Sequence, residues 1–184
     1  MKTVLLVLDM QEFVLGLIPG ADTVIANAAK AIAAARNAGI QVIYCTISFR
    51  AGYPELRGDN KFFSNLKPRL EAAKDKLNIH PYVAPEPGDI VVVKKRISAF
   101  SGNDLEIILR SLKTEHIVMC GTASGRVLLT ILLAANDKDF KISVLSDCSA
   151  DFDHEVHNML ITKLFVPYAD VVSADEWISG LLTA

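Results

Sequence analysis

The chain has 184 residues and a formal net charge of −2; 51% of its residues are hydrophobic and 22% are charged. These values are typical of one globular domain that buries its own hydrophobic core. The small net charge gives no electrostatic basis for binding nucleic acid or an anionic membrane surface, so we expect neither partner.

Short apolar runs rich in valine and isoleucine alternate along the chain with segments of helical periodicity. Such runs predict strands buried on both faces, as in a parallel sheet. The predicted strands are residues 4–8, 41–46, 90–94, 117–120, 142–145 and 171–172. The predicted helices are residues 22–38, 68–76, 105–112, 128–135, 153–165 and 174–182. This alternation predicts a single α/β domain, residues 1–184, with a three-layer, doubly wound, mainly parallel six-stranded sheet.

A long irregular region, residues 49–65, follows the second predicted strand. Loops after the carboxyl ends of strands carry ligand contacts in folds of this kind. Phe49, Arg50, Tyr53 and Arg57 are therefore candidate ligand contacts. The alternative is an ordinary surface loop.

Two later helices carry local signals. Asn103 is the expected cap of the helix that starts near Leu105. The helix at 128–135 is apolar around nearly its whole circumference, which is typical of a helix in the core or at a contact between subunits.

The cysteines and the N-terminus indicate a compartment. Cys45, Cys120 and Cys148 are an odd number and lie in or beside predicted strands, so we expect buried, reduced thiols. Asp9 interrupts the apolar start too early for a signal peptide, and no apolar run approaches the roughly 20 residues of a membrane span. We expect a cytoplasmic protein.

Two charged residues end predicted strands. Asp9 follows residues 4–8, and Lys94 ends residues 90–94. The carboxyl ends of parallel strands form the edge where α/β sheets bind ligands, so we expect Asp9 and Lys94 to form an ion pair there. Taken alone, Asp9 could be a turn residue, and Lys94 could belong to a solvated basic cluster with Lys95 and Arg96.

A glycine-containing turn, residues 121–127, joins a predicted strand to a predicted helix. Gly121 permits close approach of the backbone, and Ser124 is placed to cap the helix. The N–H groups that follow Ser124 would suit an anion or a developing oxyanion. The alternative is an ordinary buried turn.

Four segments resemble, in the right order, motifs of the isochorismatase-like cysteine hydrolase family, which includes nicotinamidases, carbamoylsarcosine amidases and isochorismatases. Asp9-Met10-Gln11 resembles the opening Asp-Met-Gln, and residues 94–100 resemble Lys-x-x-x-Ser-Ala-Phe. Residues 121–128 resemble Gly-x-x-Thr-x-x-Cys-Val, and residues 147–157 resemble a late Asp-Ala-Cys stretch followed by His. The resemblance covers nearly the whole chain.

The resemblance implies a Rossmann-like, isochorismatase-like hydrolase fold and a set of site residues. Asp9 would be the general base, and Lys94 would support it. The turn residues Thr122, Ala123, Ser124 and Arg126 would supply oxyanion or anion contacts, with a cis peptide between Thr122 and Ala123. Phe100, the last residue of the second motif, is a further candidate substrate contact beside Phe49, Arg50 and Tyr53 of the loop. The family also implies a homo-oligomer.

The departures from the family pattern bear on the reaction. Val127 stands where the family has its cysteine nucleophile, and a branched alkyl group cannot attack a carbonyl. Cys120 and Cys148 are weak candidates for a replacement. No histidine occurs between Cys45 and Lys76, so we expect no metal site and no cofactor. His154 and His157 are expected to be surface or cap residues.

Three functions remain open on these grounds. The first is a hydrolase that acts without a cysteine on a small carbonyl, amide or vinyl-ether metabolite, through Asp9 and Lys94. True isochorismatases in the family lack the cysteine and cleave a vinyl ether with the aspartate as general acid, which would require a raised pKa at Asp9. The second is a catalytically silent protein that binds a small anionic or carbonyl ligand near Lys94 and Arg126. The third is an oligomeric scaffold.

Overall fold

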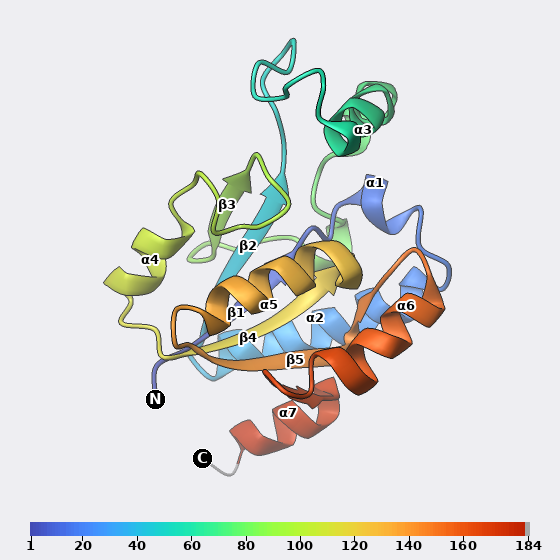
Figure 1. Ribbon diagram of the computed structural model, residues 1–184. Coiled ribbons are helices and arrows are strands. Elements are labelled where there is room, and N and C mark those ends of the chain that lie inside the picture. The colour runs from blue at the N-terminus through green and yellow to red at the C-terminus, as the bar shows by residue number, and fades with distance from the viewer. Residues whose placement is uncertain (183–184) are drawn as a thin grey trace.

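The computed structural model describes residues 1–182, and its centre is a sheet of six parallel strands (Figure 1). The strands run in the order β3-β2-β1-β4-β5-β6, so the sheet is wound in both directions from β1. The strands are β1 (Thr3–Leu8), β2 (Gln41–Ile47), β3 (Ile90–Lys94), β4 (His116–Thr122), β5 (Lys141–Ala150) and β6 (Asp170–Val172). The predicted doubly wound α/β sheet is confirmed.

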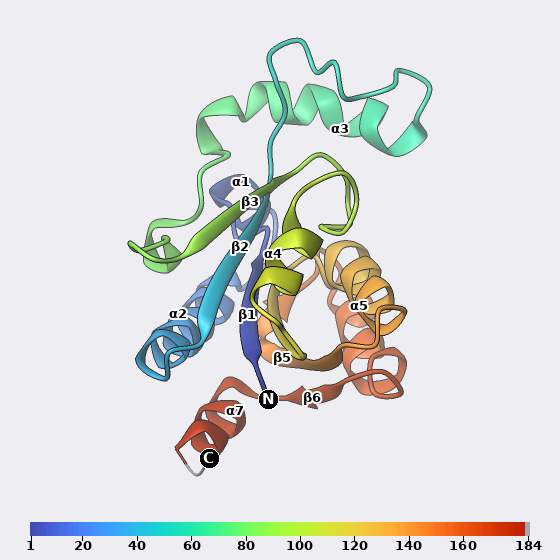
Figure 2. The same cartoon turned by 90° about the vertical axis from the view of Figure 1, so that its left-hand side faces the viewer.

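Helices cover both faces of this sheet (Figure 2). The α-helices are α1 (Glu12–Leu15), α2 (Ala21–Asn37), α3 (Lys61–Ala72), α4 (Leu105–Ser111), α5 (Leu129–Asn136), α6 (His154–Met159) and α7 (Ala174–Leu181). The short helical turns are η1 (Lys74–Lys76), η2 (Pro81–Val83), η3 (Ser124–Leu128) and η4 (Leu160–Leu164). The predicted helix at 153–165 is thus α6 followed by the wider turn η4.

Alternation along β1 divides the core into two layers. Val4, Leu6 and Leu8 pack with residues of α4 and α5, whereas Leu5 and Val7 pack with residues of α2 on the other face. Successive side chains of a strand point to opposite faces, so a continuous apolar run suits a strand covered on both sides.

The third strand departs from the expectation of burial on both faces. Val92 and Lys94 of β3 are buried, but Val91 and Val93 are 47% and 43% exposed. β3 is an edge strand, and one of its faces lacks a complete helical cover. An apolar run alone cannot distinguish such an edge strand from a central one.

Two helix starts differ from those predicted. α3 begins at Lys61, within the region expected to be irregular, because the Asn60 side chain accepts hydrogen bonds from the N–H groups of Phe62 and Phe63. Pro68 lies inside this helix. Asp104 precedes α4 in the cap position, while Asn103 Oδ1 accepts from the Leu105 N–H at 3.0 Å.

The register aligns the strand ends that build the site. Leu8 pairs with Cys45 of β2 and with Gly121 of β4, while Ile47 pairs with Lys94. The residues that follow these pairs therefore lie at one edge of the sheet, and α1 and α3 stand beyond that edge (Figure 1, Figure 2). Within residues 1–182, no helix has the length and hydropathy needed to cross a membrane.

Candidate active site

Asp9 and Lys94 meet at the carboxyl edge of the sheet although β2 lies between their strands. Lys94 Nζ lies 2.7 Å from Asp9 Oδ2, and the two side chains are 0% and 6% exposed. The expected ion pair is confirmed. Its burial means that each charge depends on the other, since unpaired charges are costly in a low-dielectric interior.

The backbone holds Asp9 in an uncommon conformation. Its φ is +47°, in the left-handed region that aspartate tolerates better than most residues. The Asp9 N–H donates to the Cys45 carbonyl at 2.8 Å, and Thr122 Oγ1 donates to the Asp9 carbonyl at 2.9 Å. These two hydrogen bonds hold the Asp9 backbone in this conformation and so direct its carboxylate. A positive φ at a residue other than glycine is a local strain that is often found at functional sites.

The second carboxylate oxygen of Asp9 is not satisfied by the protein. Within the described part of the chain, Asp9 Oδ1 is buried and has no hydrogen-bond partner. Burial raises the pKa of Asp9, while the charge and hydrogen bond of Lys94 and the nearby Ile47 backbone oppose the rise. An orphaned, buried oxygen with a raised pKa can hold a proton for a ligand or accept one from it.

The turn after β4 comes unusually close to the end of β1. Gly121 has φ +125°, and a Cβ atom there would lie 2.0 Å from the Leu8 carbonyl oxygen. Only glycine permits this approach. The peptide bond between Thr122 and Ala123 is cis, as the family resemblance implied. The turn thereby brings Ala123 and Val127 to the Asp9 carboxylate, since all three line one cavity.

The amides expected to serve as oxyanion donors are occupied. The N–H groups of Arg126 and Val127 donate to the Ala123 carbonyl at 3.2 and 2.8 Å, and that of Gly125 donates to Asp151 Oδ2 at 2.6 Å. The wide first turn of η3 folds these groups back onto the chain. The sequence predicted that these N–H groups would be available to a ligand. In the structure they already donate to acceptors within the protein.

Ser124 does not cap η3. Its hydroxyl lies 2.8 Å from His157 Nδ1, and both side chains are buried. The expectation that His157 is a surface or cap residue was wrong, because α6 packs this face of the helix against η3. Burial lowers the pKa of His157. His154, the first residue of α6, is exposed as expected.

A cavity of about 80 Å³ encloses the Asp9 carboxylate in mostly apolar walls. Val127 forms part of the wall and is 7% exposed, so it presents a hydrocarbon side chain to the cavity. The lining residues are Asp9, Phe13, Val14, Leu17, Ile47, Phe62, Leu66, Arg69, Leu70, Lys94, Ile97, Thr122, Ala123, Arg126, Val127 and Phe152.

The candidate contacts in the loop after β2 lie elsewhere. Phe49 packs near Tyr53 and edge-on to Phe63, and Arg50 forms an ion pair with Glu55 at 2.7 Å. Arg57 pairs in the same way with Asp59. None of these candidates lines the Asp9 cavity among the described residues.

Phe100 is also placed away from the cavity. Its ring stacks on Phe140 at 6.4 Å between centroids, beneath the Lys138 ammonium group. The aromatic end of that motif thus packs in the helical layer, whereas Lys94 at its beginning enters the cavity.

The expectation of an irregular region at 49–65 and a helix from residue 68 missed the contacts that α3 makes with the cavity. Phe62, Leu66, Arg69 and Leu70 of α3 form one wall of the cavity. Their spacing of three and four residues after the Asn60 cap is the signal that predicts this helix face.

Among the described residues, no cysteine lies where it could act as a nucleophile in the Asp9 cavity. Cys45, Cys120 and Cys148 are free and buried, and none of them lines the cavity. Burial raises the pKa of Cys45 and of Cys120 to about 12, which keeps these thiols protonated and poorly nucleophilic. In the described structure, no three His, Cys, Asp or Glu side chains are grouped to hold a metal ion.

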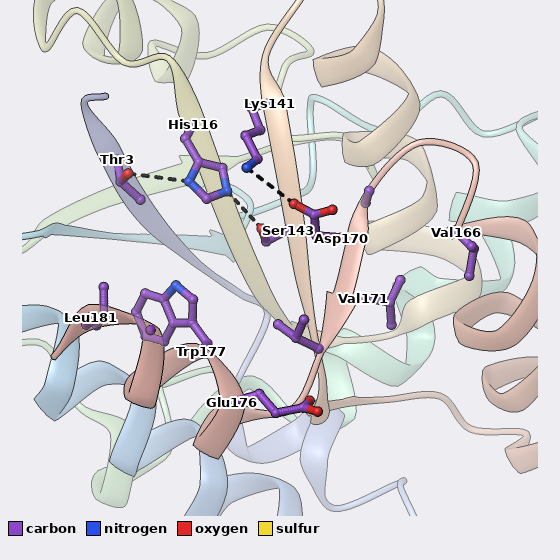
Figure 3. A pocket seen from close by; sticks show the side chains of 13 residues that line it. Thr3, His116, Lys141, Ser143, Val166, Asp170, Val171, Glu176, Trp177 and Leu181 are labelled. Atoms are coloured by element: carbon purple, nitrogen blue, oxygen red, sulfur yellow. Dashed lines mark hydrogen bonds and ion pairs between the residues drawn. The ribbon is translucent and has the colours of Figure 1, made fainter. Parts of the chain in front are cut away.

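A larger hollow of about 680 Å³ lies at the opposite edge of the sheet, where Thr3, His116 and Lys141 begin their strands (Figure 3). Its polar groups satisfy one another: His116 contacts Thr3 Oγ1 at 3.4 Å and Ser143 Oγ at 2.8 Å. Lys141 pairs with Asp170 at 3.4 Å. The unsatisfied oxygen of Asp9 makes the smaller cavity the better candidate for chemistry.

Comparison with known proteins identifies the family of this chain. The Isochorismatase domain family model matches residues 3–176. Phenazine biosynthesis protein PhzD of Pseudomonas fluorescens is 32% identical over 177 residues, covering 95% of this chain and 84% of that protein. Ureidoacrylate amidohydrolase RutB of Variovorax paradoxus is 31% identical over 163 residues, covering 81% of this chain and 63% of that protein.

A solved structure gives the same answer for the fold. A cysteine hydrolase from Pseudomonas syringae pv. phaseolicola aligns with a TM-score of 0.89 and 22% identity, over 99% of this chain and 93% of that one. The expected isochorismatase-like hydrolase fold is confirmed. With the family model matched across residues 3–176, the chain belongs to the isochorismatase family of hydrolases.

Proposed function

We propose that this protein is a hydrolase that uses Asp9 as a general acid and forms no covalent intermediate. The observation that carries the proposal is the buried Asp9 Oδ1, which has no hydrogen-bond partner within residues 1–182 and lies in a cavity beside Val127. The substrate is a small metabolite, and a vinyl ether suits this chemistry better than an amide or another carbonyl compound.

The acid role follows from the environment of Asp9. A carboxyl group whose pKa is raised by burial retains its proton nearer to neutral pH. In a vinyl ether, transfer of that proton to the terminal vinyl carbon leaves an oxocarbenium ion. Water then adds to this ion, and the hemiketal breaks down to a carbonyl compound and an alcohol. Lys94, 2.7 Å away, stabilises the carboxylate that remains after proton transfer.

Amide hydrolysis is the less favoured reaction at this site. It needs a nucleophile and donors for the oxyanion, but Val127 is inert and the amides of Gly125, Arg126 and Val127 are engaged within the protein. The relative named as a ureidoacrylate amidohydrolase nonetheless keeps amides among the substrates to be tested.

A catalytically silent binding protein is the second candidate. The observation that favours it is the small volume of the inner cavity, about 80 Å³, against the several hundred Å³ of most ligand pockets. In this reading, Lys94 and Arg126 would hold a small anionic or carbonyl ligand beside the turn.

An activity panel separates the two candidates. Purified protein is assayed with vinyl ethers, esters and amides, alongside Asp9→Asn and the exposed control Asp22→Asn. We expect turnover that Asp9→Asn abolishes and Asp22→Asn preserves, with thermal unfolding measured for each variant. Turnover that survives Asp9→Asn would exclude the acid role, and binding without any turnover would favour the silent alternative.

A further inference from the structure

A second compartment, of about 420 Å³, adjoins the cavity that holds Asp9. The two share Phe62, Leu66, Arg69 and Arg126, so they lie side by side; we call them the inner cavity and the outer compartment. The complete lining of the outer compartment is Lys61, Phe62, Asn65, Leu66, Arg69 and Arg126. Half of these side chains are cationic and none is a carboxylate, in a protein whose net charge is −2.

The two arginines of this compartment differ from most others in the chain. Arg36, Arg50, Arg57 and Arg110 each pair with a carboxylate at 2.6–2.7 Å. Arg69 and Arg126 have no carboxylate within 4.0 Å among residues 1–182. Their charges are therefore available to a ligand.

Aromatic rings hold these two guanidinium groups in place. The Arg69 guanidinium lies 6.0 Å from the Phe13 ring centre, and that of Arg126 lies 5.5 Å from Phe62 and 5.1 Å from Phe152. A guanidinium over a ring retains its N–H edge for a planar oxyanion, and it loses little side-chain entropy when that anion binds. The outer compartment is thus prearranged for negative charge.

We propose that the outer compartment binds a doubly charged oxyanion group at the far end of the substrate, such as a phosphate monoester or a pair of carboxylates. Arg69, Arg126 and Lys61 would contact this group, while the uncharged reacting end of the same molecule reaches Asp9. Two guanidinium groups and an ammonium group exceed what a single carboxylate neutralises. The assignment of the reacting end rests on the proposed function, but anion binding by the outer compartment does not.

The test is a titration at low ionic strength with inorganic pyrophosphate, tricarballylate and acetate, followed by NMR of the arginine side-chain N–H signals. Arg69→Gln and Arg126→Gln are compared with Lys67→Gln. Lys67 lies on α3, the helix that carries Arg69, but it does not line the outer compartment. We expect saturable binding of pyrophosphate or tricarballylate but not of acetate. Affinity should fall about tenfold in each arginine variant and stay unchanged in Lys67→Gln.

The outcomes distinguish the sources of the charge and the two proposals. Tighter binding of pyrophosphate assigns a phosphate group, and tighter binding of tricarballylate assigns carboxylates. Equal losses in all three variants would indicate a diffuse positive surface and would overturn the proposal, as would the absence of saturation. Anion binding in a protein without turnover would refute the acid mechanism alone, whereas Asp9-dependent turnover without anion binding would refute the outer site alone.

Discussion

At the scale of single residues, the proposed reaction depends on the protonation of Asp9. Its carboxylate has one oxygen on Lys94 and one without a hydrogen-bond partner among the described residues, in a cavity with mostly apolar walls. Burial raises its pKa and Lys94 opposes the rise, so the acid form persists above the pH at which an exposed aspartate ionises.

We expect the kcat/KM for a vinyl ether to fall as the pH rises through the raised pKa of Asp9, because only the protonated acid donates. The folded protein binds this proton more tightly than the unfolded chain does. The stabilisation from this group is therefore complete below about pH 4 and is lost as the pH rises through the folded pKa. A pH–rate profile measures the first effect. A rate that rises with pH would instead indicate a general base.

Val127 allows a test of the geometry around Asp9. We expect Val127→Cys to be alkylated once by iodoacetamide in the native protein, because position 127 lines the cavity. Val144→Cys, buried in β5 away from the cavity, should remain unlabelled. Mass spectrometry of the labelled protein is the measurement. An unlabelled Cys at 127 would contradict the placement of the cavity.

At the scale of elements, a buried polar contact fastens η3 to α6. Ser124 Oγ lies 2.8 Å from His157 Nδ1, and the Ser146 backbone on β5 also acts on the His157 ring, where it raises the pKa against the effect of burial. Two helical segments and a strand are thereby joined at the turn that places Val127. Removal of one partner would leave a buried polar group unsatisfied.

We expect His157→Ala to lower the free energy of unfolding by about 1–3 kcal/mol, since the Ser124 hydroxyl loses its buried partner. His154→Ala on the same helix removes an exposed ring and should change stability by less than about 0.5 kcal/mol. Urea denaturation of both variants gives the comparison. Equal losses would show that the Ser124 contact contributes nothing specific.

At the scale of the whole molecule, α5 serves the core and also presents an apolar surface. Ile131 and Leu132 are buried, whereas Leu133 is 40% exposed. Val156 and Met159 of the neighbouring α6 are 36% and 45% exposed. The core alternative for α5 is thus supported, and the exposed apolar side chains of α5 and α6 are candidates for an association surface.

We expect the protein to be a homo-oligomer that associates through this surface. Met159→Glu should then lower the molar mass measured by light scattering at micromolar concentration. Ile107→Glu on α4, where the side chain is 68% exposed, is the control and should leave the mass unchanged. A monomeric wild-type protein would contradict the expectation outright.

The sequence by itself determined the sheet and the polar groups at its edge. Apolar runs of the right length predicted all six strands, and the placement of Asp9 and Lys94 at strand ends predicted their ion pair. These inferences succeeded because hydrophobic periodicity is local, and because parallel strands bring their carboxyl ends to one edge.

Only the tertiary structure decided which distant segments meet around that edge. It placed the α3 cations beside the Asp9 cavity, buried His157 against Ser124 and left one face of β3 exposed. It also showed that the amides of η3 are bonded within the chain. The physical reason is that contact between remote segments depends on how helices pack over the sheet. The spacing of residues along the chain does not determine that packing.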